Sequence, residues 1–371
     1  MVSPAMAHTI LTANNPEMDL HTLLHSIPKI DLHRHLEGSL RLDTLTSIAL
    51  EHGVDLPSYD LEKLRPYVQV TEDYQPDFHR FLEKFKLLRR FYRTEQAIER
   101  IAYEAAADAA ADNLRYLELR FNPVALAREK GFRYSDVMDW VWAAVCRAQA
   151  DHDIIVRLIV SLIRQETETA KEVVEAAIQH RDRGVVALDL SGDEVNYPLE
   201  PFVPLFYRAR EAGLGVTVHA GEAGGPENVR EAIKLIGPER IGHGVRCIAD
   251  SDVVRMVRDH NVTLEMCPTS NYQTGVMHLI SHHPLPDLYR LGIKVTINTD
   301  DPSISDTTLS DEYFLAVADM GLEIGDLKTM IMTSIEAAFL PPNEKAALAA
   351  RFRVELDRFQ SRGRVHEDRR F

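Results

Sequence analysis

Short apolar runs alternate along the chain with longer segments in which apolar residues recur every three or four positions. The short runs are rich in Val, Ile and Leu, as parallel strands covered by helices on both faces are. They span residues 29–35, 114–121, 154–162, 185–192, 215–222, 240–245, 262–268 and 294–302. The segments between them have the period of amphipathic helices. Eight repeats of strand and helix in one chain predict an α/β fold, a closed (β/α)8 barrel of the TIM type.

Two segments exceed what a minimal barrel needs. About eighty residues, 36–113, separate the first two strands, and we expect them to form extra helices over the barrel mouth. Beyond residue 302 the pattern is helical almost to the arginine-rich C-terminus. We therefore predict one barrel domain over residues 28–361. A tail and a short lead-in helix would precede it at 1–27, and a flexible tail would follow at 362–371.

The composition describes an ordinary globular protein, with 45% hydrophobic and 27% charged residues. A net charge of -15 disfavours a broad surface for nucleic acid or anionic membranes, but it permits a small neutral ligand in a pocket. Three widely separated cysteines without a CxxC motif indicate neither a disulfide framework nor a thiolate zinc site. No segment has the pattern of a signal peptide or a membrane span. We expect a cytoplasmic protein that acts on a small molecule, and the sequence carries no signal for its oligomeric state.

The segment DLHRHLEG places His33 and His35 two residues apart in the first predicted strand. Residues i and i+2 of a strand project from the same face, so both imidazoles would point at one place. This arrangement suits a metal ion. The alternative is an exposed strand with alternating polar side chains, and the rest of the chain has to distinguish the two.

Acidic and imidazole side chains occur at almost every predicted strand end, which is where barrel enzymes carry their reactive groups. Each has an ordinary explanation when taken alone: His219 as a hydrogen-bonded core histidine, His243 as part of a tight loop, and Asp301 as a helix cap. Together they indicate a site at the barrel mouth. The residues at these ends are His33, His35, Glu118, Asp189, Gly192, His219, Glu222, His243, Cys267, Asp300 and Asp301.

Three neutral imidazoles and a carboxylate, with one position left for water, form a familiar catalytic site for zinc or a similar divalent ion. Such an ion lowers the pKa of a water from 15.7 to about 7. Glu222, three residues after a predicted ligand, would exchange protons, and His243 and Asp301 would hold or orient the attacking water. The predicted ligands of one Zn²⁺ per chain are His33, His35, His219 and Asp300.

Six motifs in order resemble the successive signatures of the adenosine deaminase family, within the amidohydrolase superfamily. They are DLHRHLEGSL, DLSGDE, HAGE, RIGHG, CPTSNYQTG and TINTDDPS, and the likeness runs from about residue 28 to residue 340. The resemblance implies a mononuclear zinc barrel that replaces the 6-amino group of a purine with oxygen. The binuclear members of the superfamily bridge their metals with a lysine on the fourth strand, and the run VVALDLSG contains none. The resemblance to the family also implies His33, His35, His219 and Asp300 as the metal ligands.

The resemblance assigns further roles position by position. Glu222 matches the acid that protonates purine N1, and His243 and Asp301 match the groups that orient the attacking hydroxide. Asp301 would later face the leaving ammonia. The backbone N–H of Gly192 matches a contact to purine N3.

Glu37 stands where many adenosine deaminases carry an aspartate that reaches the ribose 5′-hydroxyl, and this departure leans toward the free-base enzymes. The segment PDFHRFLEKF resembles the apolar lid of the family. That likeness would place Phe78, Phe81, Leu82 and Phe85 at the pocket entrance, and Phe81 and Phe85 among the substrate contacts. The alternative is a helix buried against its neighbours.

We predict adenosine or 2′-deoxyadenosine as the substrate, with inosine or 2′-deoxyinosine and ammonia as products. The alternatives are adenine, adenosine monophosphate, or another 6-aminopurine with a different 5′ substituent. A nucleotide would need basic groups near the pocket, and the candidates are Arg34, Arg41 and Arg120. A remote alternative is an inactive barrel that serves as a binding protein, which the retention of Glu222 and His243 disfavours.

Overall fold

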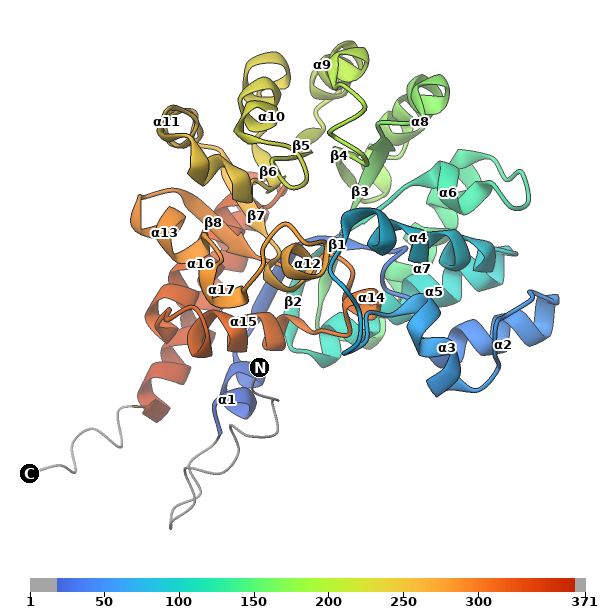
Figure 1. Cartoon of the computed structure of the whole chain (residues 1–371), viewed down its shortest axis with the longest axis horizontal. Helices are drawn as coiled ribbons and strands as arrows, with labels where there is room; N and C mark the ends of the chain where they lie inside the picture. The colour runs from blue at the N-terminus through green and yellow to red at the C-terminus, as the bar shows by residue number, and fades with distance from the viewer. Residues whose placement is uncertain (1–18, 364–371) are drawn as a thin grey trace, which may run out of the picture.

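The computed structural model describes residues 19–363 and contains one sheet of eight strands, each parallel to the next along the chain. Helices surround these strands, as Figure 1 shows. The predicted (β/α)8 barrel is therefore confirmed. The strands are β1 (Lys29–His35), β2 (Leu114–Phe121), β3 (Ile155–Ile163), β4 (Val185–Ser191), β5 (Gly215–Ala220), β6 (Arg240–His243), β7 (Thr263–Met266) and β8 (Lys294–Ile297).

The barrel closes where the segment after β8 meets β1. The backbone N–H of His35 donates to the carbonyl of Asp300 at 2.8 Å, and the N–H of Asp300 donates to the carbonyl of His33 at 2.8 Å. Arg34 and Asp300 form the corresponding parallel bridge. Residues that we predict to bind a metal thus also join the first strand to the last.

Extra helices occupy the segment between the first two strands, as expected. At the start of α4 the N–H of Asp77 donates to the carbonyl of Gln273 at 3.2 Å, which ties this helix to α12 (Pro268–Gln273) beside the strand ends. The longest insert helix, α5, packs against β2 and α7 (Tyr134–Asp151) on the outside of the barrel. The insert helices are α2 (Leu42–His52), α3 (Leu61–Val68), α4 (Phe78–Leu88) and α5 (Glu95–Ala111).

The other helices follow the strands or cover the closing seam. They include α6 (Pro123–Ala127), α8 (Thr167–Gln179), α9 (Val203–Glu211), α10 (Pro226–Glu231), α11 (Ser251–Asp259), α13 (Leu285–Arg290), α14 (Pro302–Ser305), α15 (Leu309–Ala318), α16 (Ile324–Ala337) and α17 (Pro342–Gly363). None of the helices within residues 19–363 is long and apolar enough to cross a membrane.

A short lead-in helix, α1 (Leu20–Ser26), precedes the first strand as predicted. The buried ammonium of Lys29 donates to the carbonyls of His25 and Ile27 at 3.0 Å each, which satisfies the end of this helix. At the other end α17 continues to Gly363, two residues beyond the predicted domain boundary. The remainder of both predicted tails, 1–18 and 364–371, lies outside the described residues.

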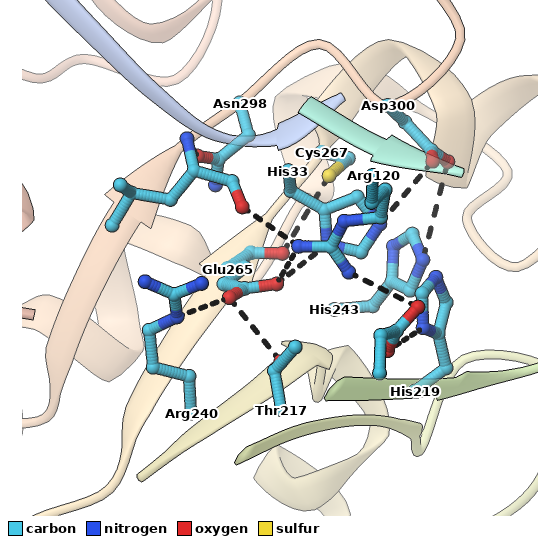
Figure 2. Close-up of polar contacts among 12 residues, drawn as sticks. His33, Arg120, Thr217, His219, Arg240, His243, Glu265, Cys267, Asn298 and Asp300 are labelled. Carbon is cyan, nitrogen blue, oxygen red and sulfur yellow. Dashed lines mark hydrogen bonds and ion pairs between the residues drawn. The ribbon is translucent and has the colours of Figure 1, made fainter. Parts of the chain in front are cut away.

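A layer of paired charges fills the barrel below the strand ends. The carboxylate of Glu265 lies 2.6 Å from Arg240 Nε and 2.8 Å from the Arg120 guanidinium, and all three side chains are fully buried. Arg240 also pairs with Glu118, and its contact with Glu265 is drawn in Figure 2. Burial acts to raise the pKa of Glu265, but the two guanidinium groups outweigh it and hold that pKa well below its usual value. Glu265 is therefore an anion in the interior.

Candidate active site

The imidazoles of His33, His35 and His219 converge with the carboxylate of Asp300 beside this layer. Figure 2 shows His33, His219 and Asp300 of this group. The ring nitrogen Nε2 of His35 lies 3.3 Å from His219 Nε2 and 3.3 Å from Asp300 Oδ1, and His33 Nε2 lies 3.3 Å from the same oxygen. The edge of a tetrahedron around zinc, with bonds of about 2.0–2.1 Å to nitrogen or oxygen, is about 3.3–3.4 Å long. The spacing of these four groups fits a tetrahedral metal site.

The hydrogen bonds behind the rings orient the lone pairs of two of them. His33 Nδ1 lies 2.7 Å from Glu265 Oε2, and His219 Nδ1 lies 2.9 Å from Asp189 Oδ1. Because a carboxylate only accepts, each Nδ1 carries a hydrogen, and the Nε2 of each ring turns to the centre, where it can offer a lone pair to a cation. His33 Nε2 is buried without a hydrogen-bond partner. When several acceptor atoms converge with no donor among them, a cation between them is needed to offset their mutual repulsion.

Burial keeps the pKa of His35 well below its ordinary value, so this ring is neutral, as a metal ligand must be. Burial and Arg120 also act to lower the pKa of His33. The carboxylates of Asp300 and Glu265 outweigh them and raise the pKa of His33. A proton and a metal ion therefore compete for His33 Nε2.

His243 lies in the same cluster and leaves two sets of candidate ligands. Ring or carboxylate atoms of His33, His219, His243 and Asp300 all lie within 4.8 Å of one another. His243 Nε2 is 4.0 Å from Asp300 Oδ2, farther than the 3.3 Å of His35 Nε2 from the other oxygen. Distance favours His35 over His243 as the third imidazole.

Two of these residues adopt a backbone conformation that side chains rarely take. The φ angle is 60° at His243 and 64° at Asp300, in the left-handed region. Such conformations cost on the order of 1–3 kcal/mol and persist where the surroundings impose them. At Asp300 the surroundings are the backbone hydrogen bonds to β1, and Ser270 also donates to its Oδ2 at 2.7 Å.

Glu222 stands on a loop that a second glutamate holds. The carboxylate of Glu194 accepts from the backbone N–H groups of Gly221, Glu222 and Gly224 at 2.8, 2.7 and 2.8 Å. The Glu222 carboxyl lies 3.6 Å from His243 Nε2. Burial, then the charges of Asp300 and Glu194, raise the pKa of Glu222 well above its ordinary value. Glu222 is thus a protonated acid beside the cluster.

The two neighbouring aspartates titrate in opposite directions. Burial acts to raise the pKa of Asp300, but His33 and the other surrounding imidazoles hold it well below its usual value. Burial and the charge of Asp300 raise the pKa of Asp301 well above normal. One of the pair is therefore an anion and the other a neutral acid, and Asp301 Oδ1 is buried without a hydrogen-bond partner.

A cavity of about 300 Å³ opens above these groups, and residues from α4 form part of its wall. The predicted site residues that line it are His35, Glu37, Phe78, Phe81, Leu82, Phe85, Gly192, His219, Glu222, His243, Asp300 and Asp301. His33 lies beneath, fully buried. The structure thus brings the predicted site residues together around one cavity.

Glu37 lines this cavity, and only one of its two carboxylate oxygens accepts a hydrogen bond. Its Oε1 accepts from the N–H of Asn122 at 2.8 Å, whereas its Oε2 is buried without a hydrogen-bond partner. Burial raises the pKa of Glu37 to about 7, although the hydrogen bond from Asn122 and the charge of Arg89 oppose this shift.

Two residues from the list of strand ends do not belong to the site. Glu118 lies in the charged layer and accepts from the N–H of Phe339, far from the mouth, because it faces inward in the middle of β2. Cys267 is buried and its thiol donates to the carbonyl of Glu265 at 3.5 Å. Neither lines the cavity.

The three arginines named as candidates for binding a nucleotide do not line the cavity. Arg41 pairs with Asp108 on the outside of the barrel, and Arg120 pairs with Glu265 in the charged layer. Arg34 lines a different cavity. The basic residues that do line the site are Lys86 and Arg89, at and just beyond the end of α4. Their position depends on how the insert packs, which periodicity does not reveal.

Several supporting residues have no assigned role in the sequence prediction. Glu265 and Asp189 orient His33 and His219, Glu194 holds the Glu222 loop, and Asn271 contacts His243. A carboxylate inside an otherwise apolar strand, as in VTLEMCP and VVALDLSG, is the signal that could have found the first two.

Comparison with known proteins agrees with this geometry. A sequence model of the family described as adenosine deaminase matches residues 28–354. An adenosine deaminase of Clostridium botulinum is 39% identical over 324 residues, which cover 87% of this chain and 96% of the relative. The resemblance noted in the six motifs is thereby confirmed.

Solved structures with the same fold include several deaminases. A zinc-bound amidohydrolase from Burkholderia ambifaria has a TM-score of 0.84 at 27% identity, over 95% of this chain and 96% of its own. Adenine deaminase from Arthrobacter aurescens has 0.82 at 28%, over 89% and 99%. Arabidopsis N6-mAMP deaminase has 0.80 at 30%, over 89% and 99%. The neighbours thus differ in substrate while sharing the barrel.

Proposed function

Because the chain belongs to the adenosine deaminase family and is a hydrolytic deaminase, we propose that its substrates are adenosine and 2′-deoxyadenosine. The products would be inosine or 2′-deoxyinosine and ammonia. The observation that carries the proposal is a buried acid with a raised pKa, Glu222, beside a cluster of imidazoles at one cavity. The acid can supply a proton to a ring nitrogen, and the imidazoles can hold a cation that activates the water attacking the adjacent carbon.

The spacing of the cluster and the orphaned Nε2 of His33 support one zinc ion as the cofactor. When bound, zinc would lower the pKa of a water so that it attacks at neutral pH. Asp189 and Glu265 would keep their imidazoles turned to the ion. The residues that would hold it are His33, His35, His219 and Asp300.

The protein groups around the ion divide the proton chemistry between them. Glu222 would donate its proton to purine N1, which makes C6 more electrophilic, and burial keeps that proton in place until the ring arrives. His243 would orient the attacking oxygen. Asp301, whose pKa is raised, lines the cavity and would face the leaving amine. The N–H of Gly192, at the end of β4, would bind N3.

Glu37 supports a nucleoside over a nucleotide. Glu37 lines the cavity, and its Oε2 has no hydrogen-bond partner, so it would accept a hydrogen bond from the ribose 5′-hydroxyl. A 5′-phosphate would instead be repelled by the Glu37 carboxylate. Lys86 and Arg89 line the same wall, but Glu83 lies 3.2 Å from the Lys86 ammonium, and Glu37 and Glu166 balance the charge. Phe81 and Phe85 would cover the base.

A substrate panel tests this assignment. The values of kcat/KM for adenosine, 2′-deoxyadenosine, 5′-deoxyadenosine, adenine and adenosine monophosphate should be highest for the first two. Loss of the 5′-hydroxyl should cost on the order of tenfold, the value of a hydrogen bond to a charged group. A preference for adenine or for the monophosphate would replace the proposed substrate, and equal rates with 5′-deoxyadenosine would remove the role of Glu37.

A further inference from the structure

We infer that the imidazole of His283 acts through the side-chain amide of Asn271 to place the ring hydrogen of His243 on Nε2. His283 and Asn271 are positioning residues in this scheme, since neither lines the substrate cavity. The tautomer itself does not depend on the reaction. Its use in catalysis rests on the proposed function.

The three side chains form one buried row from the barrel surface to the site. His283 follows a 3-10 turn at Ile280–His282 and is 3% exposed, Asn271 lies in α12 at 0%, and His243 ends β6 at 1%. His283 Nε2 lies 3.2 Å from Asn271 Oδ1, and Asn271 Nδ2 lies 3.0 Å from His243 Nδ1. No other polar partner of the two ring atoms His283 Nε2 and His243 Nδ1 occurs within the described chain.

A backbone group sets the direction of this row. The N–H of Leu285, at the start of α13, donates to His283 Nδ1 at 3.2 Å, and a backbone N–H cannot reverse its role. His283 Nδ1 must therefore accept, and the hydrogen of the neutral ring sits on Nε2. Burial lowers the pKa of His283 to about 3, so a second ring hydrogen is absent at neutral pH.

The remaining assignments follow in order. The Nε2–H of His283 needs an acceptor, which requires the oxygen of the Asn271 amide to face it. The amide NH₂ then faces His243 and donates to its Nδ1. With Nδ1 accepting, the neutral His243 ring carries its hydrogen on Nε2.

This hydrogen decides what His243 can do in the cluster. A nitrogen that bears hydrogen has no lone pair for a cation, so His243 is excluded as a ligand and His35 completes the imidazole set. The Nε2–H instead points to the space between Glu222 Oε2, 3.6 Å away, and Asp300 Oδ2, 4.0 Å away. From there it can donate to an oxygen that attacks the substrate. The opposite tautomer would offer a fourth imidazole lone pair and compete for the ion.

Nitrogen NMR of the wild-type protein tests the tautomer directly. Protein labelled with ¹⁵N-histidine would be recorded both metal-free and with zinc, and the rings would be assigned with His243→Gln and His283→Gln. Long-range correlations from the ring carbon hydrogens distinguish a protonated nitrogen from a bare one. We expect Nε2–H at both His283 and His243 in both samples. Nδ1–H at either ring, or a zinc-dependent loss of the His243 hydrogen, would overturn the inference.

A matched pair of variants separates positioning from structural support. His283→Gln keeps an N–H donor for Asn271 Oδ1, whereas His283→Leu removes it and frees the amide to rotate. In the leucine variant we expect signals of both His243 tautomers, unchanged zinc content, and a kcat lower by about 2- to 10-fold, one neutral hydrogen bond, at similar KM. The glutamine variant should retain a single tautomer and nearly full kcat.

Two results would contradict the role of His283. One is a single Nε2–H tautomer at His243 in the leucine variant, and the other is an equal loss of kcat in both variants. If the wild-type protein deaminated no purine, the proposed function would fail, but the tautomer measured in the metal-free protein would still support or refute the row.

Discussion

Glu312 offers a stability test that depends on one buried carboxyl group. It lies on α15 with no exposed surface, its Oε2 accepts from the N–H of Thr269 at 3.1 Å, and the Thr307 hydroxyl lies 3.3 Å from its Oε1. Burial raises its pKa from 4.5 to about 8, although these hydrogen bonds oppose the shift. Because Thr269, Ser270 and Asn271 all lie in α12, this contact supports the helix whose side chains bind Asp300 and His243.

The sign of the effect follows from the direction of the shift. An acid whose pKa is higher in the folded protein stabilises the fold in its neutral form, fully below pH 4.5. That contribution is lost as the pH rises toward 8. One pKa unit corresponds to about 1.36 kcal/mol. Between pH 5 and pH 8 the shift amounts to roughly 3 kcal/mol as an upper value, because the interior relaxes around a buried charge.

Glu312→Gln removes the titration while keeping a group that can accept from Thr269. The variant should therefore gain stability relative to wild type between pH 5 and pH 8, by about 2–3 kcal/mol in the free energy of unfolding. In thermal melts of the two proteins at both pH values this is a relative gain of several degrees. Glu72→Gln, at an exposed loop position, is the control. A difference between Glu312→Gln and wild type that stays constant with pH would refute the reasoning.

Three further predictions concern the site. His33→Ala should lose bound zinc and activity together, as measured by metal analysis and ammonia release, because its Nε2 is one of four converging ligand atoms; full zinc retention would contradict its role. Glu222→Gln should keep zinc but lower kcat by about 10²–10⁴-fold, since the amide cannot supply the proton; near-normal turnover would exclude it as the acid. Gly242→Ala should weaken zinc affinity tenfold or more in a competition with a chelator, because the new methyl would lie 2.8 Å from His33 Cε1 and 3.3 Å from His219 Cγ. Unchanged affinity there would mean that the rings can move without cost.

The barrel could be predicted because its strands differ in composition from the helices around them. Buried parallel strands read as runs of Val, Ile and Leu, and all eight were found at positions close to those observed. Predicted ends ran too far at residues 240–245 and 294–302, where β6 stops at His243 and β8 at Ile297. The polar loop residues beyond these strands continue the alternation, so the pattern alone does not mark where pairing stops.

The depth of a side chain inside the barrel could not be predicted. Glu118 and Glu222 both looked like acids near strand ends, but the first lies in the charged layer and the second at the mouth. Depth depends on the stagger between neighbouring strands, which is a property of the closed sheet and not of a local segment. For the same reason the sequence does not reveal that Glu265 lies beneath His33 and contacts its ring. Lys86 and Arg89 could not be predicted to line the site, because the orientation of α4 is set by tertiary packing.

The seam between β1 and β8 has a consequence for how the protein is made. Arg34 Nε donates to the Thr299 hydroxyl across 265 residues of chain, and the same seam brings His33 and His35 to Asp300. At a synthesis rate of about 5–20 residues per second, the first histidines wait on the order of 10–50 seconds for the aspartate to be made. During that time neither barrel closure nor the complete ligand set exists. A ribosome-bound nascent chain stalled before residue 294 should therefore lack the zinc affinity that we propose for the finished protein.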